Sequence, residues 1–335
     1  MNYKKSLRVV KRYHYNWWKI IMMVLLFPIV LFLSFLCSKI FIGYLFKYKR
    51  VGKNRKGIEL NSYEELLNEI KIKKIENFNI DKSMIKEVNI GPSSKQISAL
   101  IIEHKDFKSN KWIVGLHGFK RNKYVALRNV FYFYEKGYNI ITFDSYAHGN
   151  TYGTKSDFGK SNAEVLNSLV EWLKSVKQVD EIGVFGVSMG ATTSLYFAKE
   201  HYLENEVNWL IADCGFSGAV PQIRYFLKKY VKLPWWLMSL GINTNFRNYT
   251  KVNIRDVDLL KPYDSVKDLK ILFIHGKKDD FIPYQNSIVM HKLKTDKEVD
   301  NVSKLVLFDN AKHSSSFHFN QEQYKNEIYD FLRLN

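Results

Sequence analysis

The feature that most restricts the fold of this chain is a series of short apolar runs separated by helical patterns. The apolar runs lie at residues 97–103, 111–116, 138–143, 181–185, 209–212, 270–274 and 304–308. The helical patterns lie at residues 125–136, 161–177, 189–200, 284–293 and 321–334. Runs of this length are typical of strands buried on both faces of a parallel sheet. The alternation predicts an α/β fold with βαβ units and a mostly parallel, doubly wound sheet.

One long segment interrupts the alternation. Residues 215–255 are aromatic and basic, and they lie between the strands predicted at 209–212 and 270–274. An insertion at this point lies above the carboxyl ends of the strands, where α/β sheets bind ligands. We therefore expect a helical cap at about residues 215–255.

The N-terminal region contains an apolar stretch long enough to cross a bilayer. Residues 20–38 carry no charge, and the apolar run resumes after Lys39. A membrane-spanning helix needs about 20 apolar residues, and Trp17 and Trp18 are placed where an interfacial aromatic belt would lie. We predict one uncleaved transmembrane helix at residues 17–46. A cleaved signal peptide is the alternative, although its apolar core would be shorter, at about 7–15 residues.

The basic excess of the chain is concentrated around this helix. The formal net charge is +18, but residues 1–56 contain 13 Lys and Arg and no acid, whereas residues 57–335 contain 38 basic and 33 acidic residues. Topology and attraction to anionic lipid explain such an excess, so we expect a membrane partner and no nucleic-acid partner. Basic residues flank the apolar stretch equally on both sides. A short N-terminal tail usually stays in the cytosol, which favours a single-pass cell-membrane protein with its large domain outside.

These features divide the chain into four predicted parts. Residues 1–16 form a basic tail, and residues 17–46 form the anchor. Residues 47–84 form a basic linker and domain entry, and residues 85–335 form the α/β domain. Two cysteines, Cys37 and Cys214, are too few for a disulfide framework or a cysteine zinc cluster. Since no His, Asp or Glu cluster has metal-ligand spacing and no loop has the phosphate-binding pattern, we expect no metal and no cofactor.

The sequence GVFGVSMGA at residues 183–191 indicates a nucleophile. It contains G-x-S-x-G as Gly186, Ser188 and Gly190, directly after a predicted strand and at the start of a predicted helix. A serine on such a sharp turn is exposed at the edge of the sheet, and the helix N-terminus favours negative charge beside it. Bulky neighbours two positions away would clash in this turn. We therefore predict that Ser188 is a catalytic nucleophile.

A serine of this kind needs a base that an acid orients. In this strand-turn-helix context the chain order is serine, acid and histidine. Asp279 and Asp280 follow the sixth predicted strand, and His313 follows the seventh. We predict Asp279 as the acid, with Asp280 as the alternative, and His313 as the base, with His318 as the second choice.

The reaction also needs two N–H donors for an oxyanion. Met189, which follows the serine, supplies one backbone N–H, and Phe119, in the loop after residues 111–116, is predicted to supply the other. His117 precedes Ser188 in the chain and is not expected to be the base. Asp144 and His148 are expected to fix the conformation of their loop.

Five motifs together resemble the α/β-hydrolase superfamily. They are LHGF, FDSYAHGNTYG, GVSMGA, HGKKDDFIP and AKHSS, in this order, within about residues 85–335. The resemblance implies an eight-stranded, mostly parallel sheet, with Ser188, Asp279 and His313 as nucleophile, acid and base. In similar proteins the second motif more often reads D-x-R-G-H-G. Here Tyr146-Ala147 stands in place of Arg-Gly, so the group that the arginine anchors lacks its usual partner.

The chain most resembles membrane-anchored bacterial hydrolases described as esterases, lipases or peptidases, a group that does not fix a substrate. We therefore expect a membrane-anchored serine hydrolase that cleaves carboxylic esters or thioesters through an acyl-enzyme. The aromatic cap and the anchor suggest an acyl or otherwise apolar small-molecule substrate near the bilayer. The same triad could instead serve peptide or amide cleavage or acyl transfer. A catalytically silent surface or scaffold protein is the alternative from another class.

Overall fold

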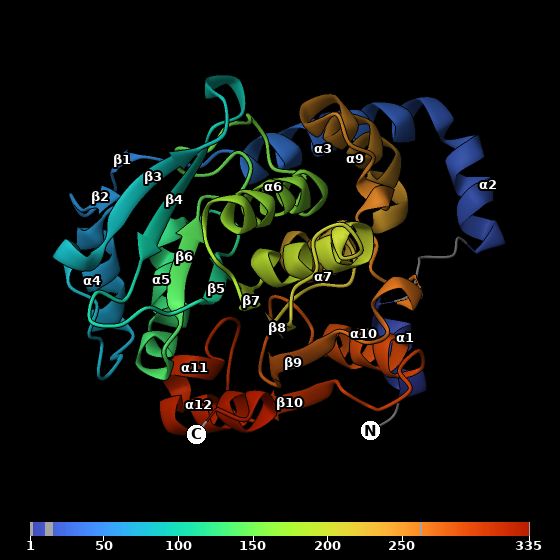
Figure 1. Cartoon of the computed structure of the whole chain (residues 1–335). Coiled ribbons are helices and arrows are strands. Elements are labelled where there is room, and N and C mark those ends of the chain that lie inside the picture. Colours follow the sequence, from blue (N-terminus) through green and yellow to red (C-terminus); the bar gives the residue numbers. More distant parts are fainter. Residues whose placement is uncertain (1–2, 11–15, 262, 335) are drawn as a thin grey trace.

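A twisted sheet of eight strands forms the centre of the molecule (Figure 1). The computed structural model describes residues 3–10, 16–261 and 263–334, so part of the predicted basic tail lies outside the described residues. The strand order is β10-β9-β8-β7-β5-β6-β4-β3. The pairs β3–β4 and β4–β6 are antiparallel, and the other pairs are parallel. The predicted mostly parallel α/β sheet is confirmed.

The seven predicted strands are all present. They are β4 (Ile97–Ile102), β5 (Lys111–Leu116), β6 (Asn139–Phe143), β7 (Glu181–Val187), β8 (Trp209–Asp213), β9 (Lys270–Gly276) and β10 (Lys304–Phe308). The eighth strand, β3 (Lys86–Ile90), was not found from an apolar run. It lies at the sheet edge and buries only Ile90 fully, so its sequence is mostly polar.

Helices cover both faces of the sheet and make two separate cores. One face carries α6 (Lys160–Val176), α7 (Met189–His201) and α10 (Gln285–Thr295), and the other carries α4 (Tyr63–Ile72), α5 (Lys123–Val130), the 3₁₀ helix η3 (Phe131–Lys136), α11 (Ser316–Phe319) and α12 (Gln321–Leu332). Successive strand residues serve opposite faces: Trp112 and Val114 of β5 pack into the first core, and Ile113 packs into the second. Burial on both faces explains why the predicted central strands are continuous apolar runs.

The predicted helical cap is present between β8 and β9. It consists of α8 (Ala219–Phe226), the π-helix η4 (Leu227–Val231) and α9 (Trp235–Thr250), followed by the short helices η5 (Ile254–Asp256) and η6 (Asp264–Val266). A third apolar core joins the cap to the sheet and includes Ile223, Met238 and Phe246 of the cap with Met189 at the start of α7. This core places the cap directly above the predicted nucleophile.

The N-terminal region forms α1 (Tyr3–Val10), α2 (Trp17–Leu25) and α3 (Phe27–Leu45), followed by the two-stranded ribbon of β1 (Gly52–Lys53) and β2 (Glu59–Leu60). Within the described part of the chain, α3 is the one helix whose length and composition suit a membrane span. The predicted single helix is interrupted at Leu26, just before Pro28, whose ring lacks an N–H for the helical ladder.

One face of α3 packs along α9 of the cap (Figure 1). Val30, Ser34, Ser38 and Ile42, at four-residue spacing, are the buried residues of α3. The Gly241 N–H donates a hydrogen bond of 2.9 Å to Ser34 Oγ. A Cβ at Gly241 would lie 2.2 Å from the Ser34 carbonyl oxygen, so the two backbones approach as closely as a glycine allows. The predicted anchor is therefore also part of the folded domain.

Candidate active site

Ser188 lies on a strained turn between β7 and α7. Its φ of +58° is in the left-handed region, which non-glycine residues rarely adopt. The turn is tight because the backbones touch: a Cβ at Gly186 would lie 2.3 Å from the Gly190 carbonyl oxygen, and a Cβ at Gly190 would lie 2.7 Å from that of Leu116. Both glycines of the G-x-S-x-G motif are thus required by close approach, and the packing holds the serine at the carboxyl end of the sheet.

The structure brings together the three residues that the sequence analysis selected. Ser188 Oγ lies 3.0 Å from His313 Nε2, and His313 Nδ1 lies 2.7 Å from Asp279 Oδ2. In this arrangement the Nδ1–H donates to the carboxylate, and Nε2 is left to accept the serine proton. The Asp280 carboxylate instead lies 3.4 Å from Lys229 Nζ on the cap. His318 is near Lys73 and Arg128, and burial lowers its pKa to about 4.

Asp279 is a buried carboxylate with several donors. The backbone N–H groups of Phe281 and Ile282 donate to its Oδ1, at 2.9 and 2.8 Å. Burial alone would raise the pKa of Asp279, but hydrogen bonds and charge interactions with His275 and His313 outweigh it and lower the pKa well below its ordinary value. The group therefore stays ionised at neutral pH and can stabilise a charged His313.

His275 is a partner of the acid that the sequence analysis did not assign. Its Nε2 lies 3.2 Å from Asp279 Oδ2, and its Nδ1 lies 2.7 Å from Ser287 Oγ. Since β9 ends at Gly276, the imidazole belongs to the end of the strand and fixes the carboxylate in the loop that follows. The four-residue spacing between the histidine and the aspartate in HGKKD is the sequence signal that could have indicated this contact.

The two predicted oxyanion donors lie beside the nucleophile. Met189 is the first residue of α7, where backbone N–H groups have no acceptor within the helix. Phe119 lines the same small cavity as Ser188. His117 holds this loop: its Nε2 accepts from the Ser145 N–H at 2.9 Å, and its Nδ1 lies 2.8 Å from the Gly118 carbonyl oxygen. Burial lowers the pKa of His117 below its ordinary value, which favours the neutral imidazole at neutral pH.

Arg50 supplies a guanidinium to the loop that lacks an arginine of its own. The guanidinium donates hydrogen bonds to the backbone carbonyls of His148, Gly149, Thr151 and Gly153. Arg50 comes from the predicted linker, about a hundred residues away in the chain, and sequence spacing carried no signal for this contact. The loop is therefore fixed by the N-terminal region.

Two cavities meet at Ser188. The smaller, of about 80 Å³, is almost entirely apolar, and Phe41 and Leu45 of α3 form part of its wall together with Ile223 and Phe226 of the cap. The larger, of about 380 Å³, is also lined by His313 and by basic side chains. The sequence analysis treated α3 as an anchor alone. The structure makes its last turns part of the pocket.

Cys214 lies close to Asp279 and His313. The atoms of these three side chains that could bind a metal ion lie within 4.8 Å of one another. Burial raises the pKa of the Cys214 thiol well above its ordinary value, so the thiol stays protonated. The carboxylate and the imidazole are hydrogen-bonded to each other. Metal binding needs a thiolate, whereas this thiol is protonated and its two neighbours already bind each other. The three groups therefore suit a hydrogen-bonded catalytic site better than a metal site.

This fold, with a serine on its strand-to-helix turn and an imidazole and a carboxylate within reach, defines a serine hydrolase of the α/β-hydrolase superfamily. The profile of the prolyl oligopeptidase family matches residues 126–334. The chain belongs to that family.

The chain is also similar to individual proteins. The chain is 28% identical over 221 residues to the uncharacterized protein YqkD of Bacillus subtilis, a match that covers 66% of this chain and 70% of YqkD. The esterase PF2001 of Pyrococcus furiosus is similar in structure, with a TM-score of 0.61 and 24% identity over 85% of this chain and 98% of the esterase. An acylaminoacyl peptidase of Pyrococcus horikoshii has a TM-score of 0.54 and 20% identity, over 82% of this chain and 44% of the peptidase. At these identities the structural likeness concerns the fold.

Asp213 is a second buried carboxyl group close to the site. It ends β8, its backbone carbonyl accepts the Ser188 N–H at 2.8 Å, and its Oδ2 accepts a hydrogen bond of 2.9 Å from the Tyr324 hydroxyl. Burial raises the pKa of Asp213 from 3.8 to about 6. The folded protein therefore binds this proton more tightly than the unfolded chain does.

We expect the free energy of unfolding of Asp213→Asn, measured relative to that of wild type, to increase as the pH rises from about 4 to 8. A carboxyl group whose pKa is raised by folding contributes fully to the free energy of unfolding at pH values below its pKa in the unfolded chain. This contribution is lost as the pH rises through its pKa in the folded protein, whereas asparagine does not titrate. A shift of this size corresponds to roughly 3 kcal/mol. Denaturant unfolding of the full chain in nonionic detergent measures it, with the exposed Asp268→Asn as control. Parallel pH profiles for Asp213→Asn and wild type would contradict the raised pKa.

Proposed function

We propose that the protein hydrolyses carboxylic esters or thioesters of acyl substrates, with Ser188, His313 and Asp279 as the catalytic residues. The observation that carries the proposal is the apolar cavity that opens at Ser188. Among its lining residues in the described part of the chain, Gln222 and Ser188 are the polar ones. Such a cavity suits an acyl chain, whose burial contributes about 0.8 kcal/mol for each CH₂ group.

The geometry supports a two-step reaction through an acyl-enzyme. His313 Nε2 accepts the Ser188 proton while Oγ attacks the carbonyl carbon, and the backbone N–H groups of Phe119 and Met189 stabilise the oxyanion. His313 then returns the proton to the leaving oxygen or sulfur as its bond to the carbonyl carbon breaks. Water, deprotonated by the same imidazole, releases the acid and restores the serine. Asp279 keeps His313 in the required tautomer throughout.

Peptide or amide cleavage is the second candidate, favoured by the family and by the acylaminoacyl peptidase among the similar structures. A peptide chain brings amide groups that need hydrogen-bond partners when they are buried. The apolar cavity provides few such partners, which supports ester substrates. The hydrogen bonds that join Ser188, His313 and Asp279 argue against the third alternative, a silent scaffold.

A fluorophosphonate probe tests the nucleophile. We expect the wild-type chain to be labelled and the Ser188→Ala variant to remain unlabelled, because the probe forms its bond with an activated serine oxygen. Ser175→Ala, on the exposed surface of α6, is the matched control and should be labelled as wild type is. Equal labelling of the Ser188→Ala variant would remove Ser188 from the reaction.

The neighbouring carboxylates allow a direct comparison. Asp279→Asn is expected to lower kcat for an acyl ester by about 10⁴-fold, because the amide cannot hold His313 in the active tautomer. Asp280→Asn should change kcat less than threefold, since its carboxylate faces Lys229. The measurement is steady-state hydrolysis of one p-nitrophenyl ester by both variants. A larger loss in Asp280→Asn than in Asp279→Asn would reverse the assignment.

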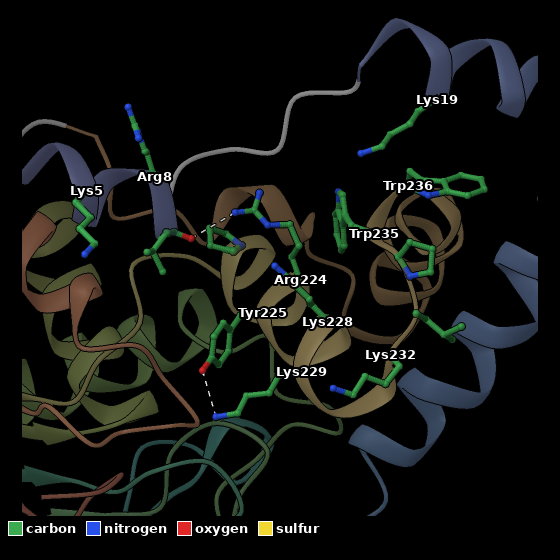
Figure 2. Close-up of a pocket in the computed structure, with 14 residues that line it drawn as sticks. Lys5, Arg8, Lys19, Arg224, Tyr225, Lys228, Lys229, Lys232, Trp235 and Trp236 are labelled. Atoms are coloured by element: carbon green, nitrogen blue, oxygen red, sulfur yellow. Dashed lines mark hydrogen bonds between the residues drawn. The ribbon is translucent and has the colours of Figure 1, made fainter.

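Membrane attachment through α2 and α3 belongs to the same proposal. Most side chains of α2 are apolar and exposed, among them Trp17, Ile21, Val24 and Leu25. A groove of about 1250 Å³ lies between α2 and the cap, with Lys19 on one side. Figure 2 shows the cap residues that line it: Arg224, Lys228, Lys229, Lys232, Trp235 and Trp236. Basic side chains and tryptophan next to an apolar helix are typical of contact with anionic lipid headgroups.

We expect the full chain to stay in the membrane fraction after alkaline carbonate and after about 1 M salt, because apolar burial is not screened by ions. Release by either treatment would contradict attachment through α2 and α3.

Protease added to intact cells is expected to reach the domain from outside. In the structure α1 packs against α10, and this contact must open if the tail is cytosolic. A tail cleaved from the same side as the domain would contradict a crossing helix.

A further inference from the structure

The larger cavity at Ser188 carries an excess of positive charge. Its lining includes the basic residues Lys73, Lys120, Arg121 and Arg128, and no acidic side chain lines it in the described part of the chain. Behind the lining, Glu69 pairs with Arg121 at 3.3 Å and with Arg128 at 2.5 Å. One carboxylate therefore serves two guanidinium groups, and the two lysines add further positive charge to the same space.

The two lysines line the cavity at positions where a bound anion would stabilise their charge. The Lys120 ammonium lies 5.4 Å from the centre of the Phe119 ring and 5.8 and 5.9 Å from those of Tyr48 and Tyr44, and no described carboxylate is within ion-pair distance. Burial lowers the pKa of Lys120. Burial and then the charge of Arg128 lower the pKa of Lys73. A bound anion would reverse these effects.

The position of this cavity relative to the nucleophile defines its role. His313, which would protonate the leaving group, lines the basic cavity. The apolar cavity shares Ser188 and the apolar side chains of Phe41, Leu45, Phe119, Phe226 and Phe281 with the basic cavity, but its further lining residues, among them Phe158, Phe216 and Ile223, carry no charge. An ester bound with its carbonyl at Ser188 thus has its acyl chain in the apolar cavity and its leaving group beside His313 and the cations.

We propose that the basic cavity is the leaving-group subsite and that the preferred substrate is the acyl ester of an alcohol that bears a phosphate group. This inference rests on the proposed function. Ser188 Oγ bonds to the acyl carbon, the ester C–O bond breaks, and His313 donates its proton to the departing alkoxide. The phosphorylated alcohol leaves, and water then releases the fatty acid. No further reactant is needed.

A phosphate fits this subsite better than a single carboxylate. Guanidinium groups bind phosphate oxygens through paired hydrogen bonds, and ammonium groups act as additional point charges. Glu69 already pairs with the two guanidinium groups, but one carboxylate does not balance four cations, and the remaining positive charge suits a phosphate dianion better than a second single carboxylate. The wall formed by Phe41 and Leu45 of the N-terminal helix also joins the acyl cavity to the segment proposed to lie in the membrane. An amphipathic lipid ester satisfies both cavities at once.

The test compares three esters with the same acyl chain on the full-length protein in nonionic detergent: acyl glycerol 3-phosphate, monoacylglycerol and acyl lactate. We expect kcat/KM for the phosphate ester to exceed that for the neutral ester by at least tenfold, mainly through KM, and the ratio to fall as salt is added. Lys73→Gln combined with Lys120→Gln should reduce the ratio by on the order of tenfold. Lys82→Gln combined with Lys86→Gln, on the far edge of the sheet, is the control of equal charge and should keep the ratio.

The outcomes separate this inference from the proposed function. Cleavage of monoacylglycerol that depends on Ser188, without preference for the phosphate ester, would overturn the subsite and leave the esterase intact. A preference for acyl lactate over the phosphate ester would overturn it in favour of a carboxylate. If the protein cleaves none of the three and no probe labels it, both proposals fail. If the Lys73→Gln and Lys120→Gln double variant kept the wild-type ratio of kcat/KM between the phosphate ester and the neutral ester, the leaving-group subsite would also be refuted.

Discussion

The close packing of backbone around the turn at Ser188 is the constraint on which the rest of the site depends. Gly186, Gly190 and the end of β5 approach within distances that leave no room for a Cβ, and this contact forces the serine into a left-handed conformation. The strain is kept because the surrounding sheet is buried on both faces. The hydroxyl then points out of the sheet edge, where loops from two later strands can bring an acid and a base.

The N-terminal region is integrated into the catalytic domain. Arg50 binds the loop after β6, α3 packs along α9, and Phe41 and Leu45 form a wall of the apolar cavity at Ser188. These contacts cross the predicted boundary between linker and domain near residue 85. Removal of the first 56 residues would therefore take away part of the pocket and the guanidinium that holds a neighbouring loop. The helix whose length and composition suit a membrane span thus also lines the pocket.

Sequence reasoning succeeded where one local pattern controls one element. The central strands appear as apolar runs because both of their faces are covered, and the order of serine, acid and histidine follows from the order of the strands. It missed β3, because an edge strand with one exposed face has a mixed sequence. It also missed His275 and Arg50, because their partners are side chains and carbonyl groups whose positions depend on the folded loops.

The amino-acid sequence by itself determined the class of fold, the turn that presents Ser188, and the loops from which Asp279 and His313 come, since each depends on periodicity or on residues a few positions apart. The tertiary structure alone decided that α3 lines the pocket and that four basic side chains line a second cavity at Ser188, and it places Asp279, which the sequence already favoured over Asp280, against His313. The physical reason is that these contacts join residues tens to hundreds of positions apart. Their distances are set by how the sheet, the cap and the N-terminal helix pack together, and local sequence carries no record of that packing.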